Sequence, residues 1–396
     1  MSGLLVALPF MFFWTVPDSP AEPIATLSYS SELVFPLNAE HNHAPGIAEL
    51  ENGELIVSWY RGAGERKADD VRVLGARLPV GSKTWSSEFL LADTPGFPDC
   101  NTCLMVDSKN RLWLFWPLIL ANTWESCITR YRVSESPVGD GPPQWSDDGM
   151  ILLKPDEFHE EGIAELERTI AELPKPLTDE FNQKIDLAKQ QMKDKLYQRL
   201  GWQPRCKPTV LPSGRILLPL YTDTFSVCIM AISDDGGRSW FASRPLLGFG
   251  AIQASVLRRN DGTLLSYMRE NGFTGRIRVS ESKDDGVTWG PVGTIDIPNP
   301  GSGLDALRLQ NGHWLIVCND THDGRNRLTM YRSVDEGHHW TAMRSLEDQP
   351  QGSYHYPAMI QTRDGRIHVV YSYFVEAGKS MKHCSFEENW LEEAQE

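Results

Sequence analysis

A repeated turn pattern constrains the fold of this chain more than any other feature of its sequence. The pattern reads Ser-x-Asp-x-Gly-x-x-Trp, and its copies begin at Ser233, Ser282 and Ser333, about fifty residues apart. In a tight turn, the Asp side chain can bond its own backbone and the Gly can adopt a positive φ. The Trp would then pack between neighbouring sheets. We therefore interpret these copies as elements that hold the fold together and not as catalytic residues.

A second repeat interleaves with the first. Turn-like residue pairs are each followed by a run rich in β-branched, aromatic and aliphatic residues, such as LIVSWY or IHVVY, which is typical of a hairpin turn that leads into a strand. The pairs begin at Asn52, Asn110, Ser213, Asp261, Asn311 and Asp364. Six repeats of about fifty residues, each long enough for four short strands, predict an all-β, six-bladed β-propeller.

The spacing fails once, between the second and third turns. The excess lies at 155–203, where the composition changes to Glu, Lys, Leu and Gln. Apolar residues fall there at helical spacing, and Pro174 and Pro176 separate two such stretches. The stretches contain Ile163, Leu166 and Ile170, then Phe181, Ile185, Ala188, Met192, Leu196 and Leu200. We predict a helical hairpin that caps the mouth of the propeller, decorates its rim or makes a dimer contact.

The remaining boundaries follow from this insertion and from the two termini. We expect propeller blades over 23–154 and 204–386, and an acidic tail over 387–396. The apolar stretch 4–14 is too short to span a bilayer and resembles the core of a secretory signal within 1–22. This interpretation predicts a secreted or periplasmic protein without a stable membrane span. The alternative for the same stretch is a buried N-terminal strand.

Charge and composition exclude several classes of function. The chain has 38 Lys and Arg against 53 Asp and Glu, a net charge of −15, and such an acidic chain repels a phosphate backbone. We therefore expect no nucleic-acid partner. Its 7 Cys are scattered, and the single CxxC at Cys100 and Cys103 lacks the second half of a zinc site. Phosphate-binding and dinucleotide-binding motifs are missing, so we expect no cofactor and no metal.

Several segments resemble the bacterial BNR-repeat sialidase-like family, in which the Ser-x-Asp-x-Gly-x-x-Trp pattern is the Asp-box. They are His43 to Ile47, Asp69 and Asp70, Lys207 and Pro208, Phe249 to Gln253, Pro298 to Leu307, and Tyr354 to Ala358. The resemblance runs from about residue 40 to 385, interrupted by the insertion. It implies a six-bladed propeller whose active site lies at the axial mouth and faces a glycan.

The resemblance also implies site residues. Sialidases hold the sialate carboxylate with three Arg, use an Asp as general acid/base, and use a Tyr–Glu pair as nucleophile. By position, Tyr354 corresponds to the nucleophile and Asp70 lies near the acid/base. Arg276 and Arg325 lie near the second and third Arg, whereas His43 stands in place of the first.

Other positions depart from the family pattern or add to the site. Arg258 stands where the Glu partner of the nucleophile is expected, and Glu270 is a possible substitute. Because the first Arg is replaced, the inference of sialic acid as substrate is weaker than that of the fold. Arg269 matches an inner-strand Arg of the family, and Asp305 lies in a small-residue segment suited to ligand approach or to capping its own turn. The candidate sugar-binding residues are Lys207, Gln253, Arg269, Arg276, Asp305, Arg325 and Tyr356, and the candidate catalytic residues are Asp70, Tyr354, His43 and Glu270.

Three functions remain open. The first is an exported glycoside hydrolase that removes a terminal sialic-acid-like or uronate sugar from an acidic glycan. The second is a polysaccharide lyase, in which His43 or Tyr354 abstracts the proton alpha to a uronate carboxylate that an Arg or Lys207 neutralises. The third is a non-catalytic glycan-binding propeller. A lyase yields an unsaturated product that absorbs in the near ultraviolet, whereas a hydrolase yields a new reducing sugar without that absorbance.

Overall fold

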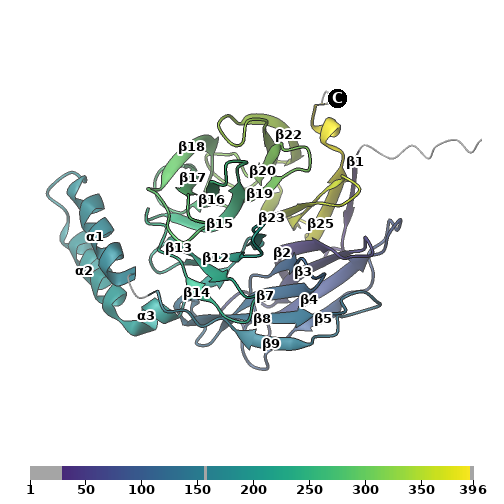
Figure 1. Ribbon diagram of the computed structural model, residues 1–396, viewed down its shortest axis with the longest axis horizontal. Coiled ribbons are helices and arrows are strands. Elements are labelled where there is room, and N and C mark those ends of the chain that lie inside the picture. Colours follow the sequence, from purple (N-terminus) through teal and green to yellow (C-terminus); the bar gives the residue numbers. More distant parts are fainter. Residues whose placement is uncertain (1–28, 156–157, 393–396) are drawn as a thin grey trace, which may run out of the picture.

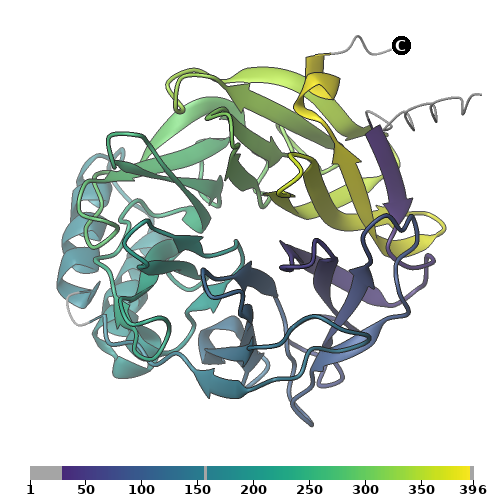
Figure 2. The same ribbon diagram turned by 45° about the vertical axis from the view of Figure 1, so that its right-hand side comes forward.

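The protein folds into six antiparallel sheets arranged in a ring around a central axis (Figure 2). The structure is a computed structural model, and it describes residues 29–155 and 158–392. Five sheets have four strands and one has five. This arrangement is the six-bladed β-propeller that the sequence repeats predict. The predicted signal segment 1–22 and the last part of the predicted acidic tail lie outside the described residues.

Blades 1 to 3 follow the chain in order, each from its innermost strand outward. Blade 1 contains β2 (His41–Glu49), β3 (Leu55–Gly62), β4 (Arg72–Leu78) and β5 (Phe89–Ala92). Blade 2 contains β6 (Cys103–Val106), β7 (Leu112–Ile119), β8 (Cys127–Ser134) and β9 (Asp147–Met150), with a short helical turn η1 (Trp124–Ser126). Blade 3 contains β10 (Gln203–Pro204), β11 (Thr209–Val210), β12 (Ile216–Thr222), β13 (Val227–Ser233) and β14 (Phe241–Ala242).

Blades 4 to 6 complete the ring (Figure 1). Blade 4 contains β15 (Ala251–Arg258), β16 (Leu264–Glu270), β17 (Arg276–Ser282) and β18 (Gly293–Pro298). Blade 5 contains β19 (Asp305–Arg308), β20 (Trp314–Cys318), β21 (Arg327–Ser333) and β22 (Thr341–Asp348). Blade 6 contains β23 (Ser353–Gln361), β24 (Ile367–Val375) and β25 (Gly378–Phe386), followed by η2 (Glu388–Glu392).

The ring is closed by the N-terminal strand β1 (Tyr29–Leu33), which is the outermost strand of blade 6. It pairs with β25 over its whole length, with Tyr29 opposite Phe386. The Tyr29 ring also stacks on Trp390 at a centroid distance of 4.3 Å. The first described strand therefore completes the last blade, so the two ends of the chain are joined within one sheet.

The Asp-box residues act as turn elements, as the sequence predicts. In the first copy, Ser233 Oγ donates to Asp235 Oδ1 (2.9 Å) and accepts the Gly237 N–H (2.8 Å). Gly237 has a φ of +90°, and its Cα lies so close to the Trp113 ring of blade 2 that a Cβ would clash. The other two copies repeat both hydrogen bonds. The turns therefore fix blades 3, 4 and 5, each against the blade before it.

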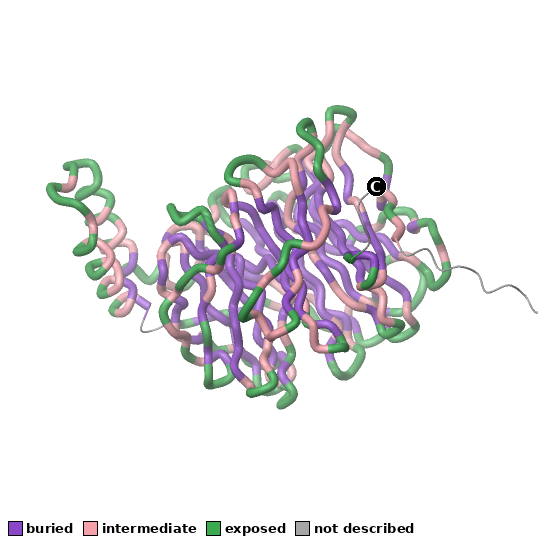
Figure 3. The backbone as a smooth tube through the Cα atoms, turned by 90° about the horizontal axis from the view of Figure 1, so that it is seen from above, coloured by how far each residue is buried: buried purple, intermediate pink, exposed green. Residues whose placement is uncertain are grey.

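Aromatic contacts of the same turns link neighbouring blades. Trp240 of blade 3 packs edge-on against Phe115 of blade 2, with ring centroids 6.1 Å apart. Trp340 of blade 5 makes the equivalent contact with Tyr267 of blade 4 at 5.4 Å. Buried strands converge on the centre of the molecule, whereas exposed residues gather at the turns (Figure 3). The core is thus a set of apolar layers between blades, which holds the polar axial residues rigidly.

The predicted helical hairpin is present between blades 2 and 3. It consists of α1 (Phe158–Ala171), α2 (Asp179–Lys193) and the short α3 (Lys195–Arg199). Phe158 and Met192 at its base are buried against Phe225 beside β12, and Arg244 pairs with Glu161 of α1 (2.7 Å). Figures 1 and 2 both place the hairpin at the rim. Of the predicted placements, the structure therefore shows the rim. No helix among residues 29–155 and 158–392 has the length and apolar character needed to cross a bilayer.

Three inner strands share a backbone irregularity that positions the site. Ala44 in β2, Gln253 in β15 and Tyr356 in β23 have φ values of +52°, +57° and +49°. At each of them the register with the next strand shifts, which marks a β-bulge. A bulge re-aims the side chains around it. These bulges lie near the start of each strand, so they direct polar side chains to one end of the axis.

Candidate active site

Polar side chains from several blades meet at the end of the axis where the inner strands begin. They come from β2, β15 and β23, from the ends of second strands, and from the loops that follow them. We define the axial cluster as His41, His43, Glu65, Asp223, Gln253, Arg269, Arg325, His355 and Tyr356. Most of these residues are partly exposed, whereas His43 and Gln253 are buried.

The phenolic oxygen of Tyr356 is the point where hydrogen-bond donors converge. Arg269 Nη1 donates to Tyr356 Oη at 3.1 Å, and Gln253 Nε2 donates to the same oxygen at 3.4 Å. Arg269 Nη1 also donates to Gln253 Oε1 (3.4 Å). Donors placed in this way would stabilise negative charge that develops on that oxygen during a reaction.

Two more guanidinium groups lie against the Tyr356 ring. Arg205 lies 4.9 Å from the ring centroid, is buried, and donates to backbone oxygens of Tyr356 and Pro45. Arg325 lies 5.7 Å from the centroid and donates to the Gly301 oxygen (2.9 Å). Burial is the main cause that lowers the pKa of Arg325. An incoming anion would offset the burial of this cation, so the site favours an anionic ligand.

Two imidazoles of the cluster, those of His43 and His355, are held neutral. Burial, followed by the neighbouring His355, lowers the pKa of His43 well below its usual range. Burial, followed by Arg325, lowers the pKa of His355 to about 3. Arg325 Nη1 lies 2.7 Å from His355 Nδ1, which must therefore accept, and Ser353 Oγ lies 2.8 Å from Nε2. At neutral pH, neither ring therefore carries a charge.

The carboxylates of Asp223 and Glu65 face the same space, but their pKa values shift in opposite directions. Burial raises the pKa of Asp223, and Arg269 opposes this change without cancelling it. For Glu65, burial raises the pKa, but the nearby His41 and the hydrogen bond from Tyr60 outweigh it and the net shift is downward. Asp223 therefore suits a proton donor, whereas Glu65 suits a permanent negative charge or a ligand.

The structure places Tyr354 away from the axis, which corrects its expected position. Its side chain is fully buried between blades 5 and 6, where its ring packs against Tyr371 and Tyr373 at centroid distances of 6.2 and 5.6 Å. The bulge at Tyr356 causes the difference, since it breaks the alternation that would put both tyrosines on one face. Tyr356, not Tyr354, reaches the axial cluster.

Three other predicted residues also lie outside the cluster. Asp70 is exposed and accepts the Ala63 N–H with both oxygens (3.0 and 3.1 Å), so it closes its own loop. Glu270 is buried and accepts from Gly272, Thr274 and Arg278. Arg276 is exposed and pairs with Asp296 on the outer strand β18. Each of these side chains bonds to neighbours in its own loop or blade and does not reach the Tyr356 ring.

Lys207 and Asp305 pair with each other deeper on the axis. Lys207 Nζ donates to Asp305 Oδ2 at 2.6 Å, and Asp305 is almost fully buried. A void of about 10 Å³ adjoins them, lined by residues of five blades, which include Arg205 and Met359. The pair therefore connects inner strands below the axial cluster. Of the predicted residues, His43, Gln253, Arg269, Arg325 and Tyr356 do come together, while their roles stay predictions.

Four residues of this region were not predicted from the sequence: Glu65, Asp223, Arg205 and His355. Glu65 lies in the same loop as Asp70, and Asp223 follows the second strand of blade 3 as Asp70 follows that of blade 1. A comparison of the residues after every second strand would have found both carboxylates. His355 lies between the two tyrosines that drew attention, but a period-2 pattern directs it to the opposite face. The bulge overturns that pattern.

Comparisons with known proteins agree with this architecture. Residues 199–369 match the BNR repeat-like domain. The chain is similar to a sialidase of Micromonospora viridifaciens, 28 % identical over 174 residues that are 41 % of this chain and 26 % of that protein. It is also similar to an anhydrosialidase of Macrobdella decora, 26 % identical over 200 residues, 43 % of this chain and 25 % of that one. The chain thus spans about a quarter of the length of these curated relatives.

Solved structures resemble the whole propeller. An intramolecular trans-sialidase from Ruminococcus gnavus aligns with a TM-score of 0.66 and 13 % identity, over 90 % of this chain and 96 % of that one. A protein of unknown function from Dyadobacter fermentans aligns with a TM-score of 0.66 and 16 % identity, over 91 % of this chain and 100 % of that one. At such identities the likeness shows the fold alone. Residues 199–369 match the BNR repeat-like domain, and the chain as a whole has the β-propeller fold of these solved structures.

Proposed function

We propose that this chain is a glycoside hydrolase that removes a terminal acidic sugar from a glycan, with its chemistry at the axial cluster. The observation that carries the proposal is the convergence of Arg269 and Gln253 on Tyr356 Oη, with Arg325 beside the same ring. A planar guanidinium matches a carboxylate in two parallel hydrogen bonds. Arg269 and Arg325 would therefore hold the carboxylate of the sugar next to the phenolic oxygen.

The same geometry supports a nucleophilic displacement. Tyr356 would lose its phenolic proton to water, since Arg269 and Gln253 stabilise the phenolate. Its Oη would form a bond to the anomeric carbon while the glycosidic C–O bond breaks. A water molecule would later displace Oη, give its proton to Asp223 and release the sugar. A Tyr nucleophile avoids placing a second carboxylate against an anionic sugar, and sialidases are known exceptions to the two-carboxylate scheme. Asp223, whose pKa is raised mainly by burial, would give its proton to the leaving oxygen. This assignment replaces Tyr354 and Asp70 by residues that face the axis.

A lyase remains a second candidate because of one specific observation. Among the described residues, the hydrogen-bond partners of Tyr356 Oη are Arg269 and Gln253, and neither is a carboxylate that could activate the phenol. The neutral His43 ring lies instead 4.7 Å from the Tyr356 ring, centroid to centroid. In a lyase, Tyr356 or His43 would take the proton alpha to a uronate carboxylate. A double bond would then form in the sugar ring, and the glycosidic oxygen would leave with a proton.

The two candidates differ in their products. The purified chain is incubated with a fluorogenic sialoside and with a panel of acidic polysaccharides, followed by reducing-end and near-ultraviolet readings. We expect new reducing ends without ultraviolet absorbance, abolished in Tyr356→Phe. Product that absorbs in the near ultraviolet would establish the lyase instead. Binding of the glycans with no product from any of them would contradict both.

We also propose that the enzyme is exported, which rests on the apolar stretch 4–14 outside the described residues. Expression of the full chain in a bacterial host, followed by fractionation and mass measurement of the N-terminus, tests this. A processed chain in the periplasm or medium supports export, and an intact chain in the cytoplasm contradicts it.

A further inference from the structure

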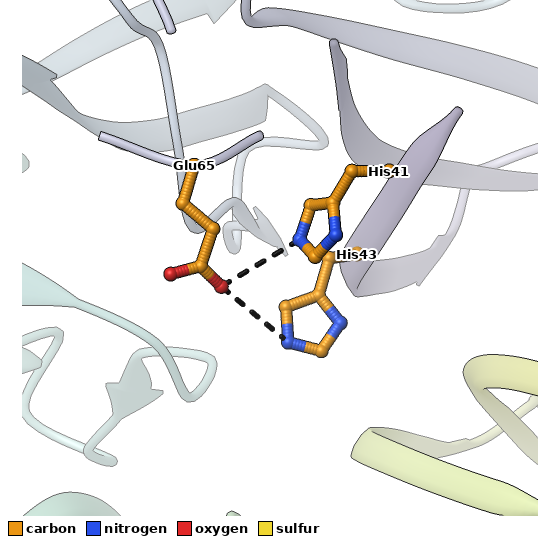
Figure 4. A group of neighbouring side chains, drawn as sticks. All are labelled: His41, His43 and Glu65. Carbon is orange, nitrogen blue, oxygen red and sulfur yellow. Dashed lines mark ion pairs between the residues drawn. The ribbon is translucent and has the colours of Figure 1, made fainter. Parts of the chain in front are cut away.

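We propose that His41, His43 and Glu65 bind a divalent transition-metal ion such as Zn²⁺. The two imidazoles come from the start of β2, and the carboxylate comes from the loop between β3 and β4 (Figure 4). All three donor groups point toward one another at the edge of the axial cluster. This site goes beyond the proposed hydrolase, because no step of that reaction uses a metal.

The distances fit a shared ion better than they fit hydrogen bonds. Glu65 Oε1 lies 3.6 Å from His41 Nε2 and 4.0 Å from His43 Nε2, and all three donor atoms lie within 4.8 Å of one another. A separation of 3.6 Å or more is too long for a hydrogen bond. In a tetrahedral zinc site, ligand atoms about 2.0 to 2.2 Å from the metal lie roughly 3.3 to 3.6 Å apart. Small rotations of the side chains would close the gap around an ion.

Neighbouring groups hold the three ligands in the required orientation. Ser372 Oγ lies 3.1 Å from His43 Nδ1, so the Nε2 of that ring faces Glu65. Tyr60 Oη donates to Glu65 Oε1 at 3.0 Å, and Arg66 pairs with the other carboxylate oxygen at 3.6 Å. Bound histidines and carboxylates in metalloproteins are usually fixed by such outer partners. The three proposed ligands therefore contact one another on one side and are held by further polar groups on the other.

Exposure and charge also suit a site with one open position. The side chain of His43 is 5 % exposed, that of His41 20 % and that of Glu65 34 %, so the group is closed on one side and accessible on the other. Two neutral imidazoles and one carboxylate are a ligand set that zinc accepts with a fourth position left for water or substrate.

The position of the site gives it a consequence for substrate binding, which rests on the proposed function. The His43 ring lies 4.7 Å from the Tyr356 ring, so an ion held by His43 lies beside the groups that would bind the sugar. A carboxylate or hydroxyl oxygen of the sugar can then complete the coordination. The metal site itself does not depend on this consequence and is tested without any glycan.

The test is a metal titration of the full chain, prepared without a polyhistidine tag and stripped with a chelator. Zn²⁺ binding is measured by calorimetry, and Co²⁺ binding by the visible absorption that this ion gains in a site of low coordination number. We expect one ion per chain, with the affinity lowered about 100-fold or more in His41→Ala and in Glu65→Gln. Both changes are at partly exposed side chains, and circular dichroism checks that the variants fold.

His313→Ala is the matched control, because His313 Nδ1 also pairs with a carboxylate, Glu388, at 2.6 Å but lies in the turn between β19 and β20, outside the axial cluster. This variant should bind the ion as the unchanged chain does. The proposal is overturned if the unchanged chain binds Co²⁺ no more tightly than Glu65→Gln, or if His313→Ala loses the ion instead. A chain that binds the metal but turns over no glycan would contradict the proposed function and leave the metal site standing.

Discussion

The axial cluster and the Lys207–Asp305 pair lie on the same axis, but their hydrogen bonds are arranged in opposite ways. Asp305 accepts from Lys207 Nζ (2.6 Å), Ser255 Oγ (2.8 Å), the Met359 N–H (2.8 Å) and its neighbour's N–H, so its oxygens are fully used. In the axial cluster, by contrast, the buried Nε of Arg269 has no partner among the described residues. Satisfied networks hold a fold together, whereas convergent and incompletely paired groups suit ligand binding.

The opposite end of the axis extends this contrast. A cavity of about 440 Å³ lies there, where the inner strands end. Its polar lining is largely paired within the protein, as Arg363 with Glu49 (3.2 Å) and Lys207 with Asp305. It is larger than the void next to Arg205, yet it offers few convergent donors. We therefore assign the chemistry to the axial cluster, because the chemistry of the side chains outweighs the size of the cavity.

The largest expected effect separates the two neighbouring tyrosines. Tyr356→Phe removes the proposed nucleophile and should lower kcat/KM about 100- to 10,000-fold with little loss of stability. Tyr354→Phe changes a ring that packs between blades and should retain activity within about threefold. Steady-state kinetics measures both variants, on the glycan that the product assay identifies as substrate. If Tyr354→Phe were the inactive variant, the contrast between axis and core would fail.

Removal of one partner of the Lys207–Asp305 pair should lower the free energy of unfolding. Asp305→Ala leaves Lys207 with an uncompensated charge near the core, and the expected loss is about 3 to 5 kcal/mol of unfolding free energy. Urea unfolding followed by fluorescence measures this, with Tyr356→Phe as the control that should unfold at nearly the normal midpoint. An Asp305→Ala protein of normal stability would show that the deeper pair is not a structural element.

A guanidinium at the axis should matter more than one at the rim. Arg269→Met removes a proposed carboxylate clamp, and KM should rise about 10- to 100-fold because charge-assisted hydrogen bonds are lost. Arg276→Met removes an exposed cation that pairs with Asp296 and should leave KM unchanged. Equal effects in the two variants would mean that the anion contacts do not lie at the axial cluster.

The smallest effect is a pH dependence of stability that originates in the cluster. The pKa of His355 is lowered to about 3, chiefly by burial, so below its ordinary value of 6.5 the unfolded chain binds more protons than the folded one. Stability should therefore fall as the pH drops through 6.5 toward 3, by at most about 1.4 kcal/mol per pH unit for one His. Urea unfolding at pH ~7 and ~5 checks this.

The variant His355→Gln should show a shallower loss in that comparison. It should not abolish the loss, because His368 in the same blade also has its pKa lowered to about 3 by burial. An unchanged slope in His355→Gln would indicate that this ring is protonated in the folded protein.

The fold could be predicted from the sequence because it is repetitive. Each Asp-box turn is short and local, and its Ser, Asp and Gly make the hydrogen bonds that their chemistry suggests. The site could be predicted in part, since the family resemblance pointed to Gln253, Arg269 and Arg325. Gln253 lies in an inner strand, Arg269 near the end of a second strand and Arg325 in a loop after one. Tyr354 was misplaced because a bulge at Tyr356 shifts the strand alternation, and no local residue pattern announces a positive φ at a tyrosine. Glu65 was missed because its meeting with the histidines depends on loop geometry.

A crystal structure of Tyr356→Phe soaked with an acidic sugar tests the central claim most directly. The account predicts the sugar at the axial cluster, with its carboxylate within hydrogen-bonding distance of Arg269 or Arg325. A sugar bound instead in the 440 Å³ cavity at the other end of the axis, beside Lys207 and Arg363, would contradict the account.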